Sequence, residues 1–209
     1  MRKVLITLCD NTPAFREMLE VSAPTHAKYA ARHGYDYFLA NADTVESQRE
    51  GRHPSWAKIR LLAQFGHEFK LFLDADVAVV DYSKDILEDF PAGKKFGMVV
   101  HHTSDGAVPN CGVLACKGDI SDEMKSIWVR DQLSRSSCWW EQAGMIDLLG
   151  GNPDATPVDV PEGPLWGELP YEWNPHVFDR RGLIPDLRFF HATQCQDRAG
   201  AMRAVRGTP

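Results

Sequence analysis

The chain has 209 residues, 44% of them hydrophobic, and a formal net charge of −6 at pH 7. This length suits one α/β domain that buries a sizeable core. The acidic balance offers no broad attraction to a phosphate backbone, so nucleic acid is not the default partner. The first apolar run, residues 4–8, is too short for a signal peptide, and no later run approaches a membrane span. We therefore expect a cytoplasmic protein.

Strand-like and helix-like patterns alternate through the first half of the chain. They predict, in order, a strand ending near Thr7, a helix over 13–32, a strand through Tyr37 and Leu39, a surface loop over 42–55, a helix over 56–66 and a strand over 70–80. Gly34 and Gly66 are the expected helix stops.

The second half continues this alternation. It predicts strands over 96–102 and 111–117, helices over 122–135 and 140–150, a long ordered loop over 150–185 and a late strand that begins near residue 187 and ends in His191. The whole pattern predicts one Rossmann-like α/β/α sandwich over 1–195, with a mostly parallel central sheet. The arginine-rich residues 196–209 are expected to form a mobile tail.

Two aspartates, Asp74 and Asp76, interrupt the apolar run LFLDADVAVV. In open α/β sheets ligands bind at the carboxyl ends of the strands, which is where this pair should lie. Side chains two apart on a strand point the same way, so both carboxylates can approach one ligand if the backbone stays extended. A divalent cation removes the repulsion between them, and hard oxygen ligands suit Mg²⁺ or Mn²⁺. Such an ion suits a diphosphate.

Other interpretations of this pair stay open at the level of the residues. The acids could end a strand in a solvated turn. A haloacid-dehalogenase-like phosphatase also uses D-x-D, with the first Asp as nucleophile, but there the motif usually opens the domain. A nucleotidyltransferase would show a glycine-rich loop after the first strand, and TLCDNTPAF contains no glycine. A non-catalytic sugar-binding module gives no reason for a metal-like pair.

Several segments together resemble a known family. They are, in order, KYAARHGYDYFLAN, WAKIRLL, LFLDADVAVV, NCGVLACK, WWEQAGMIDLL, WNPH and FFHATQ. This order is similar to that of GT-A-fold glycosyltransferases, most of all the fungal and plant galactosyl-, mannosyl- and xylosyltransferase family, and more distantly the glycogenin-type transferases. The matching segments lie between Lys28 and Gln194.

The resemblance implies a metal site and a donor site. Asp74 and Asp76, with Ala75 between them, would contact Mn²⁺ or Mg²⁺ and the ribose and diphosphate of the donor. His191 would be the third protein ligand of the metal, and imidazole is a good ligand for Mn²⁺. Asn110 would lie near the donor sugar, where an amide can bind hydroxyls; the alternative is a turn residue.

Further residues are candidates for the same site. Thr7, Tyr37 and Lys58 are candidates for binding the donor, although Lys58 could be an ordinary solvated helix charge. Glu141 and Gln142 are candidates for stabilising positive charge near the anomeric carbon. The acceptor candidates are Trp140, Trp166 and Trp173, which could equally be core residues that hold a loop.

The resemblance therefore implies transfer of a hexose or pentose from a nucleotide diphosphate sugar, expected to be a UDP-sugar, to a hydroxyl acceptor with retention of configuration. The sequence leaves the acceptor open between a protein, a glycan, a small molecule and a modified nucleobase. It gives no indication of the oligomeric state.

Overall fold

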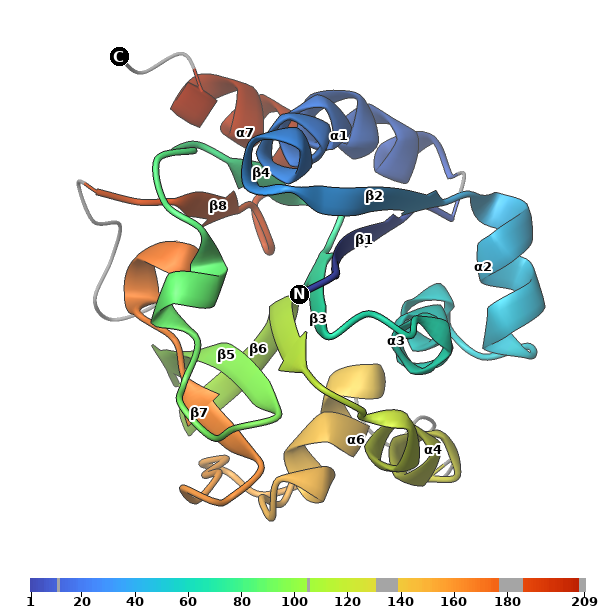
Figure 1. The fold of residues 1–209 in the computed structure, drawn as a ribbon, viewed down its shortest axis with the longest axis vertical. Helices are drawn as coiled ribbons and strands as arrows, with labels where there is room; N and C mark the ends of the chain where they lie inside the picture. The colour runs from blue at the N-terminus through green and yellow to red at the C-terminus, as the bar shows by residue number, and fades with distance from the viewer. Residues whose placement is uncertain (11, 105, 131–138, 177–185, 207–209) are drawn as a thin grey trace.

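The computed structural model describes residues 1–10, 12–104, 106–130, 139–176 and 186–206 (Figure 1). Its larger sheet has six strands in the order β2-β1-β3-β6-β5-β7. In that order they are β2 (Tyr35–Ala40), β1 (Lys3–Leu8), β3 (Phe69–Leu73), β6 (Gly106–Lys117), β5 (Phe96–Thr103) and β7 (Trp166–Glu168).

Strand direction agrees with the prediction of a mostly parallel sheet. β1 pairs in parallel with β2 and β3, and β5 pairs in parallel with β7. β6 is antiparallel to both β3 and β5, so it alone among these six strands is reversed. The central β3 reads FKLFL and is buried along its whole length, as expected for a strand covered on both faces.

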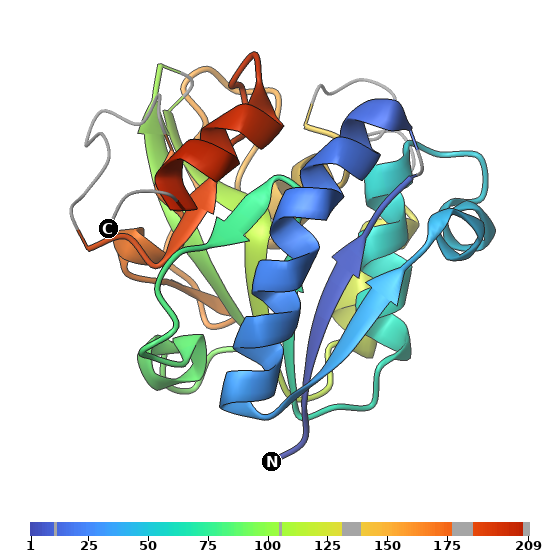
Figure 2. The same cartoon turned by 90° about the horizontal axis from the view of Figure 1, so that it is seen from above.

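Helices cover both faces of this sheet (Figures 1 and 2). They are α1 (Pro13–His33), α2 (Ala42–Arg49), α3 (Ala57–Gln64), α4 (Ser121–Trp128), α6 (Glu141–Leu148) and α7 (Arg198–Arg206). The 3-10 turns are η1 (Pro54–Trp56), η2 (Ile86–Asp89) and η3 (Tyr171–Trp173). One core cluster packs α3, α4 and α6 under one face, and a second packs α1 against the other. The predicted α/β/α sandwich is confirmed.

A second, two-stranded sheet lies on the α1 side. It pairs β4 (Val77–Val79) antiparallel with β8 (Phe189–His191), and Val77 lies opposite His191. The sequence predicted one continuous strand over 70–80, and this was wrong. The chain turns at Asp74, whose C=O accepts from the Val77 N–H at 3.0 Å, so β3 and β4 belong to different sheets.

Two further segments differ from the prediction. The expected loop over 42–55 contains α2, which begins because the Asn41 side chain accepts from the Thr44 N–H and because Val45 is buried. The expected tail contains α7, whose buried Met202 packs in a cluster with Met18 of α1. α2 has few apolar residues, which hid its periodicity, whereas the apolar residues of α7 are mostly alanines interspersed with arginines. The predicted helix over 122–135 is seen as α4, which ends at Trp128. Residues 131–135 of the predicted helix lie outside the described residues.

Among the described residues, no helix combines the length and the apolar character that crossing a membrane requires.

Candidate metal and donor site

Three side chains predicted to act together do lie together. Asp74 follows β3, Asp76 precedes β4, and His191 ends β8. Each offers one ligand atom, and these atoms lie within 4.8 Å of one another. His191 Nε2 is 3.3 Å from Asp76 Oδ1. Two carboxylates and an imidazole form a set of metal ligands that suits Mn²⁺ or Mg²⁺.

The backbone that presents the aspartates is a turn, which corrects the predicted extended geometry. The Asp74 N–H donates to Gly112 O at 2.9 Å, and the turn closes between Asp74 and Val77. On the other side, Asp76 O accepts from the Ala192 N–H at 2.8 Å. Backbone bonds to β6 and to the end of β8, rather than strand alternation, therefore bring both carboxylates to one place.

The two aspartates differ in their pKa. Burial raises the pKa of Asp74 to about 6, although the Lys58 ammonium opposes this shift. Burial also disfavours ionisation of Asp76, but His191 and Arg198 outweigh it and hold the pKa of Asp76 at about 2. Arg198 donates to Asp76 Oδ2 at 2.9 Å from the start of α7. Sequence reasoning missed Arg198 because it lies in the segment predicted to be a tail.

Lys58 is a buried cation rather than a solvated one. Its side chain is 1% exposed, and its Nζ lies 3.0 Å from Asp74 Oδ1, 2.8 Å from Glu141 Oε1 and 2.9 Å from Cys111 O. Burial lowers the pKa of Lys58, but Asp74 and Glu141 outweigh burial and raise it above its ordinary value. Lys58 therefore links the metal-type carboxylate to the first residue of α6.

Glu141 and Gln142 begin α6 and are both buried. Burial opposes ionisation of Glu141, yet the Lys58 ammonium outweighs it and lowers the pKa of Glu141. Gln142 Oε1 accepts from the Cys111 N–H at 3.0 Å, which fixes the orientation of its amide. The structure thus places a charged carboxylate and an oriented amide next to the residues around Asp74.

The Asn110 side chain faces the protein. Its Oδ1 accepts from the Gly112 N–H at 2.8 Å and from Asn174 Nδ2 at 3.0 Å. Asn174 belongs to the WNPH segment. Sequence reasoning assigned no role to Asn174. Its Oδ1 lies 3.0 Å from His191 Nδ1.

Thr7 and Tyr37, the residues predicted to bind the nucleotide, lie in the neighbouring strands β1 and β2. Thr7 is buried, and its Oγ1 lies 2.8 Å from Nδ1 of His26. His26 Nε2 donates to Val77 O at 2.8 Å, and burial lowers the pKa of His26 to about 4. Nδ1 of the neutral ring must then accept a hydrogen bond from the Thr7 hydroxyl. Burial also raises the pKa of Tyr37, whose hydroxyl lies near Thr7. Sequence reasoning did not identify His26 as a partner of Thr7.

The three acceptor tryptophans do not share a surface. Trp173 is fully buried and donates to Asp89 Oδ2 at 2.9 Å, while Trp166 is buried and donates to Pro161 O at 3.0 Å. The expectation that these two line the acceptor side is corrected: both are core residues that anchor the proline-rich loop. Trp140 is 46% exposed and stacks on the His53 ring at a centroid distance of 4.3 Å.

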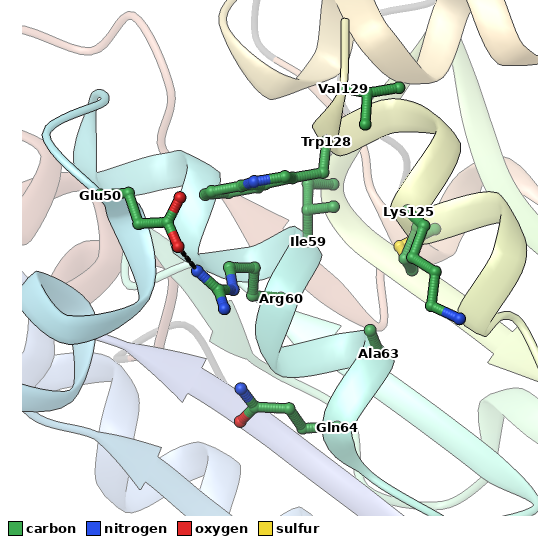
Figure 3. A pocket seen from close by; sticks show the side chains of 9 residues that line it. Glu50, Ile59, Arg60, Ala63, Gln64, Lys125, Trp128 and Val129 are labelled. Atoms are coloured by element: carbon green, nitrogen blue, oxygen red, sulfur yellow. Dashed lines mark hydrogen bonds and ion pairs between the residues drawn. The ribbon is translucent and has the colours of Figure 1, made fainter. Parts of the chain in front are cut away.

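A separate pocket lies over α3 and α4 (Figure 3). Trp128 and Ile59 form its apolar wall, and Arg60 pairs with Glu50 at its rim. None of its lining residues belongs to the group around the two aspartates, so this pocket is not part of the site described above.

The chain matches no protein-family model and no curated protein. It is similar to solved structures of glycosyltransferases. One is a glycosyltransferase involved in the glycosylation of the major capsid of PBCV-1, with 17% identity, a TM-score of 0.69, and 98% of this chain and 100% of that chain covered. Another is the galactosyltransferase LgtC in complex with donor and acceptor sugar analogues, with 13% identity, a TM-score of 0.55, and 98% and 95% covered.

A third is mouse xyloside xylosyltransferase 1, with 12% identity, a TM-score of 0.56, and 94% and 99% covered. At such identities the likeness defines the architecture. The fold is the GT-A fold of glycosyltransferases.

Proposed function

We propose that this protein is a metal-dependent glycosyltransferase that moves a sugar from a nucleotide diphosphate sugar to a hydroxyl acceptor. One observation carries the proposal: on a GT-A fold, Asp74, Asp76 and His191 converge from three separate strand ends with ligand atoms within 4.8 Å of one another. Similar folds in the solved glycosyltransferases support sugar transfer, and the family resemblance supports a UDP-sugar donor and retention.

The residues present fit a divalent ion. Two carboxylates this close repel each other unless a cation lies between or beside them, and the chain already places Arg198 against Asp76. We infer that Asp74, Asp76 and His191 hold Mn²⁺ or Mg²⁺. When bound, such an ion supplies positive charge that stabilises a leaving diphosphate without a strong protein acid.

The other side chains of the site prepare it electrostatically. Lys58 keeps Glu141 ionised, so a carboxylate is available to stabilise positive charge that develops on the donor sugar. Gln142, whose amide is oriented by Cys111, is placed beside it. We assign Glu141 and Gln142 to contact with the reacting sugar. We assign Lys58 the role of holding Glu141 in place.

The donor side is assigned from strand ends and the acceptor side from an exposed aromatic side chain. We assign the nucleotide to the strand ends near Thr7 and Tyr37 and to the turn that contains Ala75. We assign the acceptor to the side of Trp140, because an exposed indole gives an apolar platform for a sugar ring or another flat group. Among hydroxyl acceptors, a protein, a glycan, a small molecule and a modified nucleobase all remain candidates.

The phosphatase alternative is not retained. It requires the first aspartate of the pair, Asp74, as a nucleophile on a phosphatase fold, whereas the fold of this chain is that of glycosyltransferases. A sugar-binding module without turnover is separated by experiment.

The test combines nucleotide binding with turnover. Thermal stability is measured with UDP, GDP and their sugar conjugates, each with Mn²⁺ or with chelator, for wild type and His191→Ala. We expect a rise in melting temperature with one nucleotide, only with metal, and a smaller rise in the variant. Release of that nucleotide from its sugar conjugate should be nearly abolished by Asp76→Ala. Normal release by a folded Asp76→Ala protein would refute the metal assignment, and binding without release would indicate the sugar-binding module.

A further inference from the structure

A row of two asparagine side chains extends from the Nδ1 side of His191. His191 Nδ1 lies 3.0 Å from Asn174 Oδ1, and Asn174 Nδ2 lies 3.0 Å from Asn110 Oδ1. The same Asn110 oxygen lies 2.8 Å from the backbone nitrogen of Gly112. His191 and Asn174 are buried, so the bond between these two side chains does not compete with bulk water.

Hydrogen-bond chemistry allows one assignment along this row. The Gly112 N–H can only donate, so the Asn110 atom that faces it is the carbonyl oxygen. That oxygen can only accept, so the Asn174 atom that faces it is the amide nitrogen. The other Asn174 atom is then an oxygen, and His191 must carry a proton on Nδ1. The backbone of β6 therefore determines the protonation pattern of a ring that lies on β8.

The consequence appears on the other side of the ring. With its proton on Nδ1, a neutral His191 presents the lone pair of Nε2, and this nitrogen faces Asp76 Oδ1 at 3.3 Å. Two acceptors then face each other, which is unfavourable unless a cation satisfies both.

We propose that Asn174 and Asn110 are positioning residues that fix the His191 tautomer, so that Nε2 is presented to a divalent ion. This inference rests on the metal site of the proposed function. It also gives Asn110 a different task from the contact with donor sugar that the resemblance implies. Hydrogen bonding of the distal ring nitrogen is a general way to orient a metal-binding histidine.

Gly112 makes the arrangement possible. A Cβ at this position would lie 2.3 Å from His191 Cε1, 2.8 Å from His191 Nδ1 and 2.9 Å from Asn110 Oδ1. The backbone of Gly112 thus contacts the imidazole, and its N–H orients Asn110. The segments NCG, WNPH and FFHAT, which are far apart in the sequence, meet at this one ring.

The first test measures the tautomer without metal. Long-range ¹H–¹⁵N NMR spectra of histidine-labelled, metal-free protein are recorded over a series of pH values, with the signal assigned from a His191→Gln spectrum. We expect the proton on Nδ1. A proton on Nε2 would overturn the proposal. This result does not depend on whether the protein binds metal or transfers sugar.

The second test measures Mn²⁺ affinity by calorimetry for three proteins. Asn174→Leu removes the acceptor at His191 Nδ1, and we expect about 10–100-fold weaker binding. Asn152→Leu is the matched control: it removes an exposed amide whose oxygen accepts from the Asp154 N–H, so its Mn²⁺ affinity should stay close to that of wild type. If Asn174→Leu does not fold, Asn110→Leu takes its place.

Wild-type affinity in the Asn174→Leu variant, or an equal loss in Asn152→Leu, would refute the positioning role. A wild-type protein that binds no Mn²⁺ would instead refute the proposed metal function, and the NMR result would then decide the tautomer alone.

Discussion

Replacing Lys58 by Met should destabilise the protein strongly. The Lys58 side chain is 1% exposed, and its two carboxylate partners, Asp74 and Glu141, have side chains that are 31% and 7% exposed. Methionine conserves the length of the side chain but leaves these carboxylates without their cation. Removing one partner from a buried ion pair costs about 3–5 kcal/mol. For a domain of this size, that corresponds to a fall in melting temperature of about 6–20 °C.

The assay is urea unfolding followed by circular dichroism. Lys125→Met is the matched control, because Lys125 pairs with Asp122 where both side chains are mostly exposed, and it should behave like wild type. The double variant Lys58→Met/Glu141→Gln also removes the charge of Glu141, the more buried of the two carboxylates left without a cation. It should regain much of the lost stability. The reasoning fails if Lys58→Met is as stable as Lys125→Met, or if the double variant is no more stable than the single one.

Two further predictions concern Gly112 and His26. Gly112→Ala should weaken Mn²⁺ binding and lower the unfolding free energy by about 1–3 kcal/mol, because the new Cβ overlaps the His191 ring; calorimetry and urea unfolding measure both, and unchanged values would contradict the close packing. The buried neutral His26 should make stability fall as pH drops, since the unfolded chain binds a proton below its ordinary pKa of 6.5 and the folded chain only near 4. The expected loss is about 3 kcal/mol between these pH values, and His26→Gln should flatten this dependence in urea unfolding at several pH values.

Sequence reasoning succeeded where a local pattern carries the information. The apolar strand before Asp74 and the late strand before His191 can be recognised from residue type alone, and their order predicts strand ends that share one edge of the fold. The alternation of elements likewise predicted a mostly parallel sheet. Yet the reason given for the meeting of Asp74 and Asp76 was wrong, because a turn rather than an extended strand brings them together.

Other features depend on contacts that no local pattern encodes. Asn174 reaches His191 only because the end of η3 packs beside β8, and Arg198 reaches Asp76 only because α7 packs on α1. The burial of Trp173 depends on its place next to Phe189 in the core, and an indole in a proline-rich segment has the same sequence signature whether it is buried or exposed. Such tertiary contacts decide whether a polar or aromatic residue serves the site.

The pairing of β4 with β8 has a consequence for how the protein matures. The six strands of the larger sheet all come from residues before Leu169, whereas the contact between Arg198 and Asp76 joins positions 122 residues apart. During synthesis, most of the scaffold can therefore fold before the last part of the site has left the ribosome. The nascent chain therefore carries Asp74 and Asp76 well before it carries His191 and Arg198. A chain truncated before Phe189 would keep all six strands of the larger sheet but would lack His191 and Arg198.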